Sequence, residues 1–124
     1  MNLLRFKKKI LIISGSRSDY SLLKPLILNL RRDSSLITKL VITGSHLEKK
    51  FGLTIQEIKK DKIKINYKIY INAVGSSVND ISKSFNSLLN KASSLLKKTK
   101  PDGIIVLGDR HEIFAFTLAS FLLN

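Results

Sequence analysis

Two segments of this 124-residue chain place charged side chains directly after an apolar run and a glycine. They are Gly15-Ser16-Arg17-Ser18-Asp19-Tyr20, after the first apolar run, and Gly108-Asp109-Arg110, after the last. A glycine lets the backbone turn sharply beneath a ligand. In an open parallel α/β sheet, ligands bind beyond the carboxyl ends of the strands. The two segments therefore form the candidate site if both apolar runs are parallel strands.

The first segment has the chemistry of an anion site. Arg17 carries a planar guanidinium suited to phosphate or carboxylate, and the helix expected after Gly15 offers unpaired N–H groups at the positive end of its dipole. The segment is neither a Gly-x-Gly-x-x-Gly dinucleotide motif nor a P-loop. A structural alternative stays open, in which Asp19 is the helix N-cap and Arg17 is its surface partner. Tyr20 could offer its hydroxyl to a ligand or cover the core with its ring.

The second segment has the chemistry of proton transfer. Asp109 stands at the mouth of an apolar strand beside Arg110 and close to His111 and Glu112, where the pKa of a carboxyl group can be tuned. The alternative is that Asp109 caps the last helix. His46, directly after the second apolar run, could contact a ligand in the same crevice or be structural.

Alternating periodicities predict the elements that position these residues. Apolar runs predict strands at 9–14, 36–43, 63–71 and 103–107, the third with a wetter face and nearer an edge. Apolar residues at helical spacing predict a helix after the Gly15 turn, one from a Thr54–Glu57 capping box to about residue 61, a long one starting near Asp80, and one over 113–123. Pro25 is expected in the first turns of the first helix.

This alternation predicts an α/β fold, a Rossmann-like parallel sheet with right-handed crossovers that forms half or more of a doubly wound domain. The length and the 44% hydrophobic content fit one domain over residues 1–124 with a single core.

Composition argues against several classes of site and partner. The chain has no cysteine, which excludes disulfides and cysteine-based zinc or redox sites, and its two histidines argue against a dedicated metal site. The apolar stretch after the basic start, residues 10–13, is too short for a membrane span or a signal-peptide core. We therefore expect a soluble, cytoplasmic protein without a membrane partner.

The net charge of +13 could attract nucleic acid. The lysines, however, occur in short groups at expected helix ends and outer faces, and no aromatic residues interleave with them as base-stacking platforms. We interpret them as solvated faces and expect no nucleic-acid partner.

Four stretches, in order and spacing, resemble the hydrolysing UDP-N-acetylglucosamine 2-epimerases of sialic-acid and legionaminic-acid biosynthesis. The resemblance covers the chain from Lys8 to Asn124 and departs at His111, where the family usually has an aromatic residue. Its motifs are Ser14-Gly15-Ser16-Arg17-Ser18-Asp19-Tyr20 within 9–26, Thr43-Gly44-Ser45-His46 with Phe51-Gly52-Leu53-Thr54, Glu57-Ile58, and Pro101-Asp102 through Leu107-Gly108-Asp109-Arg110-His111-Glu112.

The resemblance implies a GT-B architecture, in which two Rossmann-like halves hold a sugar nucleotide between them and this chain is the N-terminal portion. It implies elimination of UDP from C1 of a UDP-sugar with loss of the C2 proton, then hydration to the 2-epimeric free sugar, with no metal or nicotinamide cofactor. By matching position, Arg17 would hold the nucleotide phosphates and Asp19 would brace its loop. Asp109 would be an acid/base carboxylate, Arg110 would contact the nucleotide and His46 would line the sugar side.

The resemblance also implies that the site is incomplete, because the family's His-x-Gly-Gly-Glu stretch and second domain would follow Asn124. We therefore expect the isolated chain to be inactive and the complete protein to be a homo-oligomer. The final helix, apolar nearly all round, is expected to promote association. Three alternatives stay open: an epimerase of UDP-N,N'-diacetylbacillosamine, a non-catalytic nucleotide-binding module, and a UDP-glycosyltransferase fragment on the same architecture.

Overall fold

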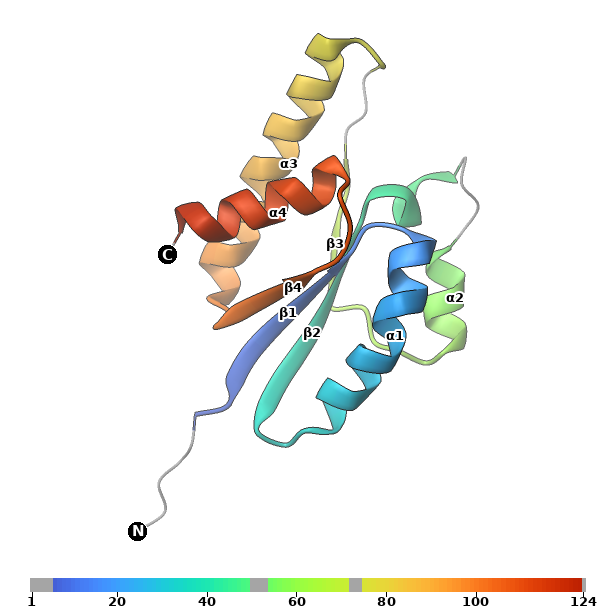
Figure 1. Ribbon diagram of the computed structural model, residues 1–124, viewed down its shortest axis with the longest axis vertical. Coiled ribbons are helices and arrows are strands. Elements are labelled where there is room, and N and C mark those ends of the chain that lie inside the picture. The colour runs from blue at the N-terminus through green and yellow to red at the C-terminus, as the bar shows by residue number, and fades with distance from the viewer. Residues whose placement is uncertain (1–5, 50–53, 72–74, 124) are drawn as a thin grey trace.

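Strands and helices alternate along the chain in the computed structural model, which describes residues 6–49, 54–71 and 75–123 (Figure 1). The stretch Phe51-Gly52-Leu53 lies outside the described residues. The elements are β1 (Lys8–Ser14), α1 (Arg17–Arg32), β2 (Leu36–Thr43), the 3-10 turn η1 (Gly44–Leu47), α2 (Ile55–Lys60), β3 (Tyr67–Ile69), α3 (Val78–Thr99), β4 (Gly103–Val106) and α4 (His111–Leu122).

The four strands form one parallel sheet in the order β3-β2-β1-β4. From β1 the chain first builds outward through β2 to β3, and α3 then carries it back across the sheet to β4 on the other side of β1. The point where the strand order reverses therefore lies between β1 and β4. This Rossmann-like arrangement confirms the predicted fold class, and β3 is an edge strand as expected.

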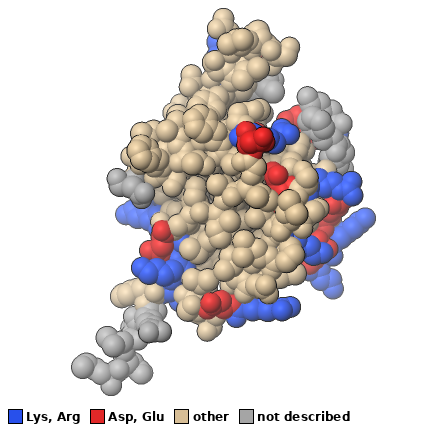
Figure 2. All heavy atoms as spheres, viewed as in Figure 1, with Lys and Arg blue, Asp and Glu red and all other residues tan. Residues whose placement is uncertain are grey.

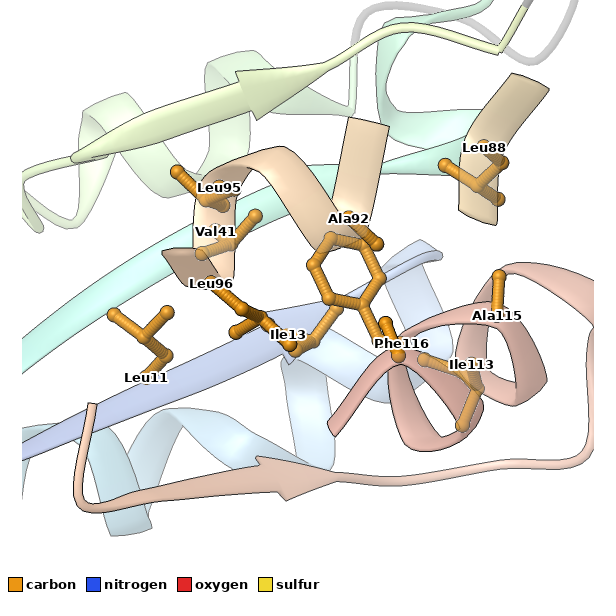
Figure 3. Packing of buried hydrophobic residues seen from close by; sticks show 11 residues of the cluster. Leu11, Ile13, Val41, Leu88, Ala92, Leu95, Leu96, Ile113, Ala115 and Phe116 are labelled. Carbon is orange, nitrogen blue, oxygen red and sulfur yellow. The ribbon is translucent and has the colours of Figure 1, made fainter. Parts of the chain in front are cut away.

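Two apolar layers cover the sheet because successive side chains of a strand point to opposite faces. Leu11, Ile13 and Val41 point toward α3 and α4, where Phe116 lies among them (Figure 3). Ile12 and Leu40 point to the other face, which α1 and α2 cover. The core thus lies on both faces and holds the carboxyl ends of β1, β2 and β4 at one edge of the sheet.

Two local predictions are wrong. Pro25 lies in the middle of α1, because Ser16 caps the helix and starts it at Arg17. Thr54 makes no side-chain capping bond to α2, because its hydroxyl is bonded to His46 instead. A capping box of this kind does occur at the start of α3, between Ser77 and Asp80.

The third strand is shorter than predicted, and Asn66 gives the reason. Its side-chain oxygen accepts a hydrogen bond from the backbone N–H of Leu40 at 2.9 Å, and its own N–H donates to the Leu40 carbonyl. An asparagine side chain therefore takes the place of a ladder bond, and β3 begins only at Tyr67.

Large apolar side chains are exposed on α4 and at the start of α3, where Val78 and Ile81 lie. Phe114 stacks on Phe85 with ring centroids 5.4 Å apart, and Phe121 and Leu122 are 76% and 61% exposed. Figure 2 shows that few charged atoms interrupt the surface over these two helices. None of the helices in the described residues is long and apolar enough to cross a membrane.

Candidate active site at the carboxyl edge of the sheet

Glycines follow three strands at the carboxyl edge of the sheet: Gly15 after β1, Gly44 after β2 and Gly108 shortly after β4. The first two loops are joined, because the N–H and the hydroxyl of Ser45 both donate to the Gly15 carbonyl, at 3.0 and 3.2 Å. Gly44 has a φ of +63° and Gly108 a φ of +111°, backbone conformations that favour glycine. The candidate site therefore begins as a set of tightly turned loops.

Glu112 of α4 lies against two of these glycines and is 0% exposed. A Cβ added at Gly15 would lie 2.9 Å from its Oε1, and one added at Gly44 would lie 2.6 Å from the same atom. The carboxylate thus occupies space that exists because both residues lack a side chain. It connects the loops after β1 and β2 with the start of α4.

The carboxylate of Glu112 faces the basic residues of its own segment. Arg110 Nε donates to Glu112 Oε1 at 2.5 Å, and His111 Nε2 lies 3.5 Å from Oε2. Oε2 has no hydrogen-bond partner among the described residues. A buried carboxylate needs nearby positive charge, which the guanidinium of Arg110 supplies.

Asp109 is exposed, and no hydrogen bond or ion pair involves its carboxylate within the described part of the chain. Arg110 and not Asp109 is the N-cap of α4, so the capping alternative for Asp109 is wrong. The carboxylate is left free to meet a ligand.

Asp19 brings the first segment to the second. A Cβ added at Gly108 would lie 3.5 Å from Asp19 Oδ1, and Asp19 Oδ2 is buried without a hydrogen-bond partner among the described residues. The N-cap of α1 is Ser16, whose Oγ accepts from the Asp19 N–H at 3.3 Å, so the capping alternative for Asp19 is also wrong. The two candidate segments are therefore neighbours at the point where the strand order reverses.

Arg17 lies on the surface and pairs with α2. Its Nη2 is 3.0 Å from Glu57 Oε1, so its partner is Glu57 and not Asp19. Both side chains are well exposed, and such a pair contributes little to stability. Arg17 can therefore leave Glu57 for another anion at small cost.

His46 lies below the loops and is 1% exposed. Its Nε2 is 2.8 Å from Ser14 Oγ and its Nδ1 is 2.9 Å from Thr54 Oγ1. Burial lowers the pKa of His46, and the nearby charge of Asp19 opposes that shift. Two hydroxyl groups thus hold the ring nitrogens of His46, which fits the structural alternative for this residue. Its contact with a sugar stays a prediction.

Tyr20 takes the structural role. Its ring is buried in the layer under α1 and α2, edge-on to His46, and its hydroxyl donates to Asp61 Oδ2 at 2.5 Å. Burial and the bond to Asp61 raise its pKa.

The residue whose importance sequence reasoning missed is Glu112, which appeared only as a neighbour of Asp109. Its position three residues after Asp109, on the inner face of an apolar helix, was the available signal. No cluster of three or more potential metal ligands occurs among the residues that the structure describes.

Comparisons with known proteins place this arrangement in a family. The family model described as UDP-N-acetylglucosamine 2-epimerase matches residues 28–124. The chain is 33% identical to GDP/UDP-N,N'-diacetylbacillosamine 2-epimerase (hydrolyzing) of Campylobacter jejuni, over 95% of this chain and 30% of that protein. It is also 33% identical to polysialic acid biosynthesis protein P7 of Escherichia coli, over 94% of this chain and 30% of that protein.

A solved structure agrees with the sequence relatives. The crystal structure of UDP-GlcNAc 2-epimerase from Neisseria meningitidis bound to UDP-GlcNAc has a TM-score of 0.77 and 28% identity, covering 93% of this chain and 30% of that one. The chain thus spans about 30% of the length of the relatives that it matches. With both sequence and fold in agreement over nearly its whole length, the chain belongs to the UDP-N-acetylglucosamine 2-epimerase family.

Proposed function

We propose that this chain supplies the N-terminal half of the active site of a cytoplasmic, hydrolysing UDP-sugar 2-epimerase. In the proposed reaction the bond between C1 and the UDP oxygen breaks, UDP leaves with the electron pair, and C2 loses its proton. Water then adds across the resulting double bond, with the hydroxyl on C1 and a proton on the opposite face of C2. The products are UDP and the 2-epimeric free sugar, N-acetylmannosamine when the substrate is UDP-N-acetylglucosamine.

The proposed roles of the residues follow from charge. Departure of UDP puts negative charge on the diphosphate, which Arg17 and Arg110 would stabilise. Asp109, an exposed carboxylate next to Arg110 in the chain, would transfer a proton. Asp19 would brace the first loop against Gly108, and His46 would form the sugar side of the floor. None of these steps calls for a metal or a nicotinamide.

The observation that carries the proposal is the meeting of the two candidate segments between β1 and β4. Ligands of open α/β sheets bind at the carboxyl edge where the strand order reverses, and this is where Asp19 lies against Gly108. The name of the Neisseria meningitidis structure, which is bound to UDP-GlcNAc, supports a UDP-sugar as the ligand.

A second substrate has support of its own. The Campylobacter jejuni relative is named for a diacetylbacillosamine nucleotide. We therefore include UDP-N,N'-diacetylbacillosamine as the alternative substrate of the same reaction.

The test compares the isolated chain with a longer protein, in which these residues replace the matching segment of the Campylobacter jejuni relative. Each is incubated with either UDP-sugar, and UDP and the free sugar are measured. We expect the longer protein to release both products and the isolated chain to release neither. A folded longer protein that binds UDP but converts neither substrate would contradict the proposal and favour a nucleotide-binding module.

Asp109→Asn in the longer protein tests the acid/base assignment. We expect loss of turnover with UDP binding retained. The matched control is Asp102→Asn, because Asp102 flanks the other end of β4, where it accepts a bond from the Lys9 N–H at 2.8 Å. Unchanged turnover in Asp109→Asn would remove Asp109 from the mechanism.

A further inference from the structure

We propose that Glu112 is a positioning residue that holds Arg110 by its Nε and so turns the outer fork of the guanidinium toward the diphosphate. The inference rests on the proposed function, because it takes the nucleoside diphosphate as the ligand of Arg110. It assigns to Glu112 a role that acts through Arg110 and not on the reacting atoms.

The first argument is the burial of Glu112. A carboxylate removed from water is costly unless it is paired, yet Glu112 is 0% exposed and one of its two oxygens has no hydrogen-bond partner among the described residues. An apolar side chain would pack there without that cost. The loops that enclose it need Gly15 and Gly44 to make the room. A buried charge at a site that two glycines keep open favours a role in binding over a role in packing.

The second argument is the atom of Arg110 that Glu112 holds. The bond joins Nε to Oε1 at 2.5 Å, and no bond from Nη1 or Nη2 to another described residue is present. Arginine carries five N–H donors in a rigid plane. Fixing the plane at Nε leaves the four outer N–H groups oriented and unused, and the side chain is still 43% exposed. This is the arrangement in which a guanidinium can bind a phosphate through two parallel bonds.

The other arginine of the site provides a contrast. Arg17 is bonded through Nη2, one of its outer nitrogens, to the exposed carboxylate of Glu57. That carboxylate occupies the part of the guanidinium that a phosphate would need, so Glu57 competes with a ligand. Glu112 instead leaves the outer nitrogens open. The two acidic partners should therefore affect nucleotide binding in opposite directions.

The experiment uses the isolated chain and UDP as the probe. NMR of the arginine side chains follows the Nε–H signal of Arg110, identified by its loss in Arg110→Lys, and titration with UDP yields the dissociation constant. In the unaltered chain we expect this Nε–H signal to be protected from exchange with water and to shift when UDP is added. This measurement needs no variant of Glu112 to fold.

Substitution then separates orientation from stability. We expect Glu112→Gln to reduce the protection of this signal, because a neutral amide oxygen is a weaker acceptor than a carboxylate oxygen. We also expect it to weaken UDP binding about tenfold, the size expected when the acceptor of a charge-assisted hydrogen bond loses its charge. Combined with Arg110→Ala, Glu112→Gln should cause no further loss, because its effect passes through Arg110. The control Glu57→Gln should bind UDP equally well or more tightly. A purely structural role would lower the free energy of unfolding and add to the effect of Arg110→Ala.

The outcomes distinguish this inference from the function on which it rests. If UDP binds and shifts other signals but not that of Arg110, or if Glu112→Gln binds UDP as well as the unaltered chain, the inference is overturned and the proposed function stands. If UDP produces no shift in any signal, the nucleotide site proposed for this chain is overturned, and the inference falls with it.

Discussion

Replacement of Gly44 by alanine tests whether the loops and Glu112 interlock as described. Gly44 has a φ of +63°, and a Cβ there would lie 2.5 Å from the Gly15 carbonyl oxygen and 2.6 Å from Glu112 Oε1. The oxygen of Gly15 is backbone and is already held by Ser45, so it cannot move aside easily. The substitution should therefore strain the backbone and push the Glu112 carboxylate away from its position.

The magnitude has two parts. An L residue in the left-handed region costs about 1–2 kcal/mol, and overpacking of a well-packed interior costs about 1–3 kcal/mol more. We therefore expect Gly44→Ala to lower the free energy of unfolding by about 2–5 kcal/mol. That is a large share of the ~5–15 kcal/mol typical of a domain.

The assay is urea unfolding, with two matched glycines as controls. A Cβ at Gly103 would meet only the end of Ile10, at 3.7 Å, so Gly103→Ala should stay within about 1 kcal/mol of the unaltered chain. Gly108 has a positive φ but its nearest contact is 3.5 Å, so Gly108→Ala should show the cost of strain without the clash, about 1–3 kcal/mol. A Gly44→Ala chain as stable as Gly103→Ala would refute the interlocking of Gly15, Gly44 and Glu112.

Three further predictions concern binding, pH and association. Arg17→Ala should weaken UDP binding, measured by titration, whereas Arg32→Ala at the far end of α1 should leave it unchanged. Equal affinities of the two variants for UDP would mean that Arg17 is a surface charge with no part in nucleotide binding. Burial lowers the pKa of His46 from its ordinary 6.5, so the unfolded chain takes up a proton that the folded chain does not, and stability should fall as the pH drops below about 6.5. Urea unfolding at several pH values gives the free energy of unfolding as a function of pH. This free energy should depend less steeply on pH in His46→Gln, and an identical dependence would assign the effect to other groups. The double variant Phe121→Ser, Leu122→Ser should show less self-association in analytical ultracentrifugation, because both apolar side chains are exposed at the end of α4. Undiminished association would show that this end of α4 is not the contact surface.

The order and type of the elements were predictable because each periodicity is a local property. Consecutive apolar residues in β1 and β4 are typical of strands covered on both faces, and helical spacing in α3 is typical of an amphipathic helix. The strand at 36–43 coincides with β2. The four stretches that resemble the family, taken together in their order and spacing, were sufficient to predict it.

Side-chain hydrogen bonds were not predictable in the same way. Thr54, Asp19 and Asp109 all stand where a sequence pattern favours a helix cap, and none of them caps its helix through the side chain. A hydroxyl or carboxylate bonds whichever partner the fold brings nearest. For Thr54 that partner is His46, which comes from another loop.

The sequence by itself determined the alternation of strands and helices, the glycine-led turns and the types of charged residue that follow them. Only the tertiary structure decided that Glu112 lies between Gly15 and Gly44 and that Asp19 lies against Gly108. These contacts depend on strand order and register, which arise when α3 crosses the sheet and packs its apolar face with α4 against β1. Because that packing joins residues far apart in the chain, no local pattern encodes which side chains meet at the edge of the sheet.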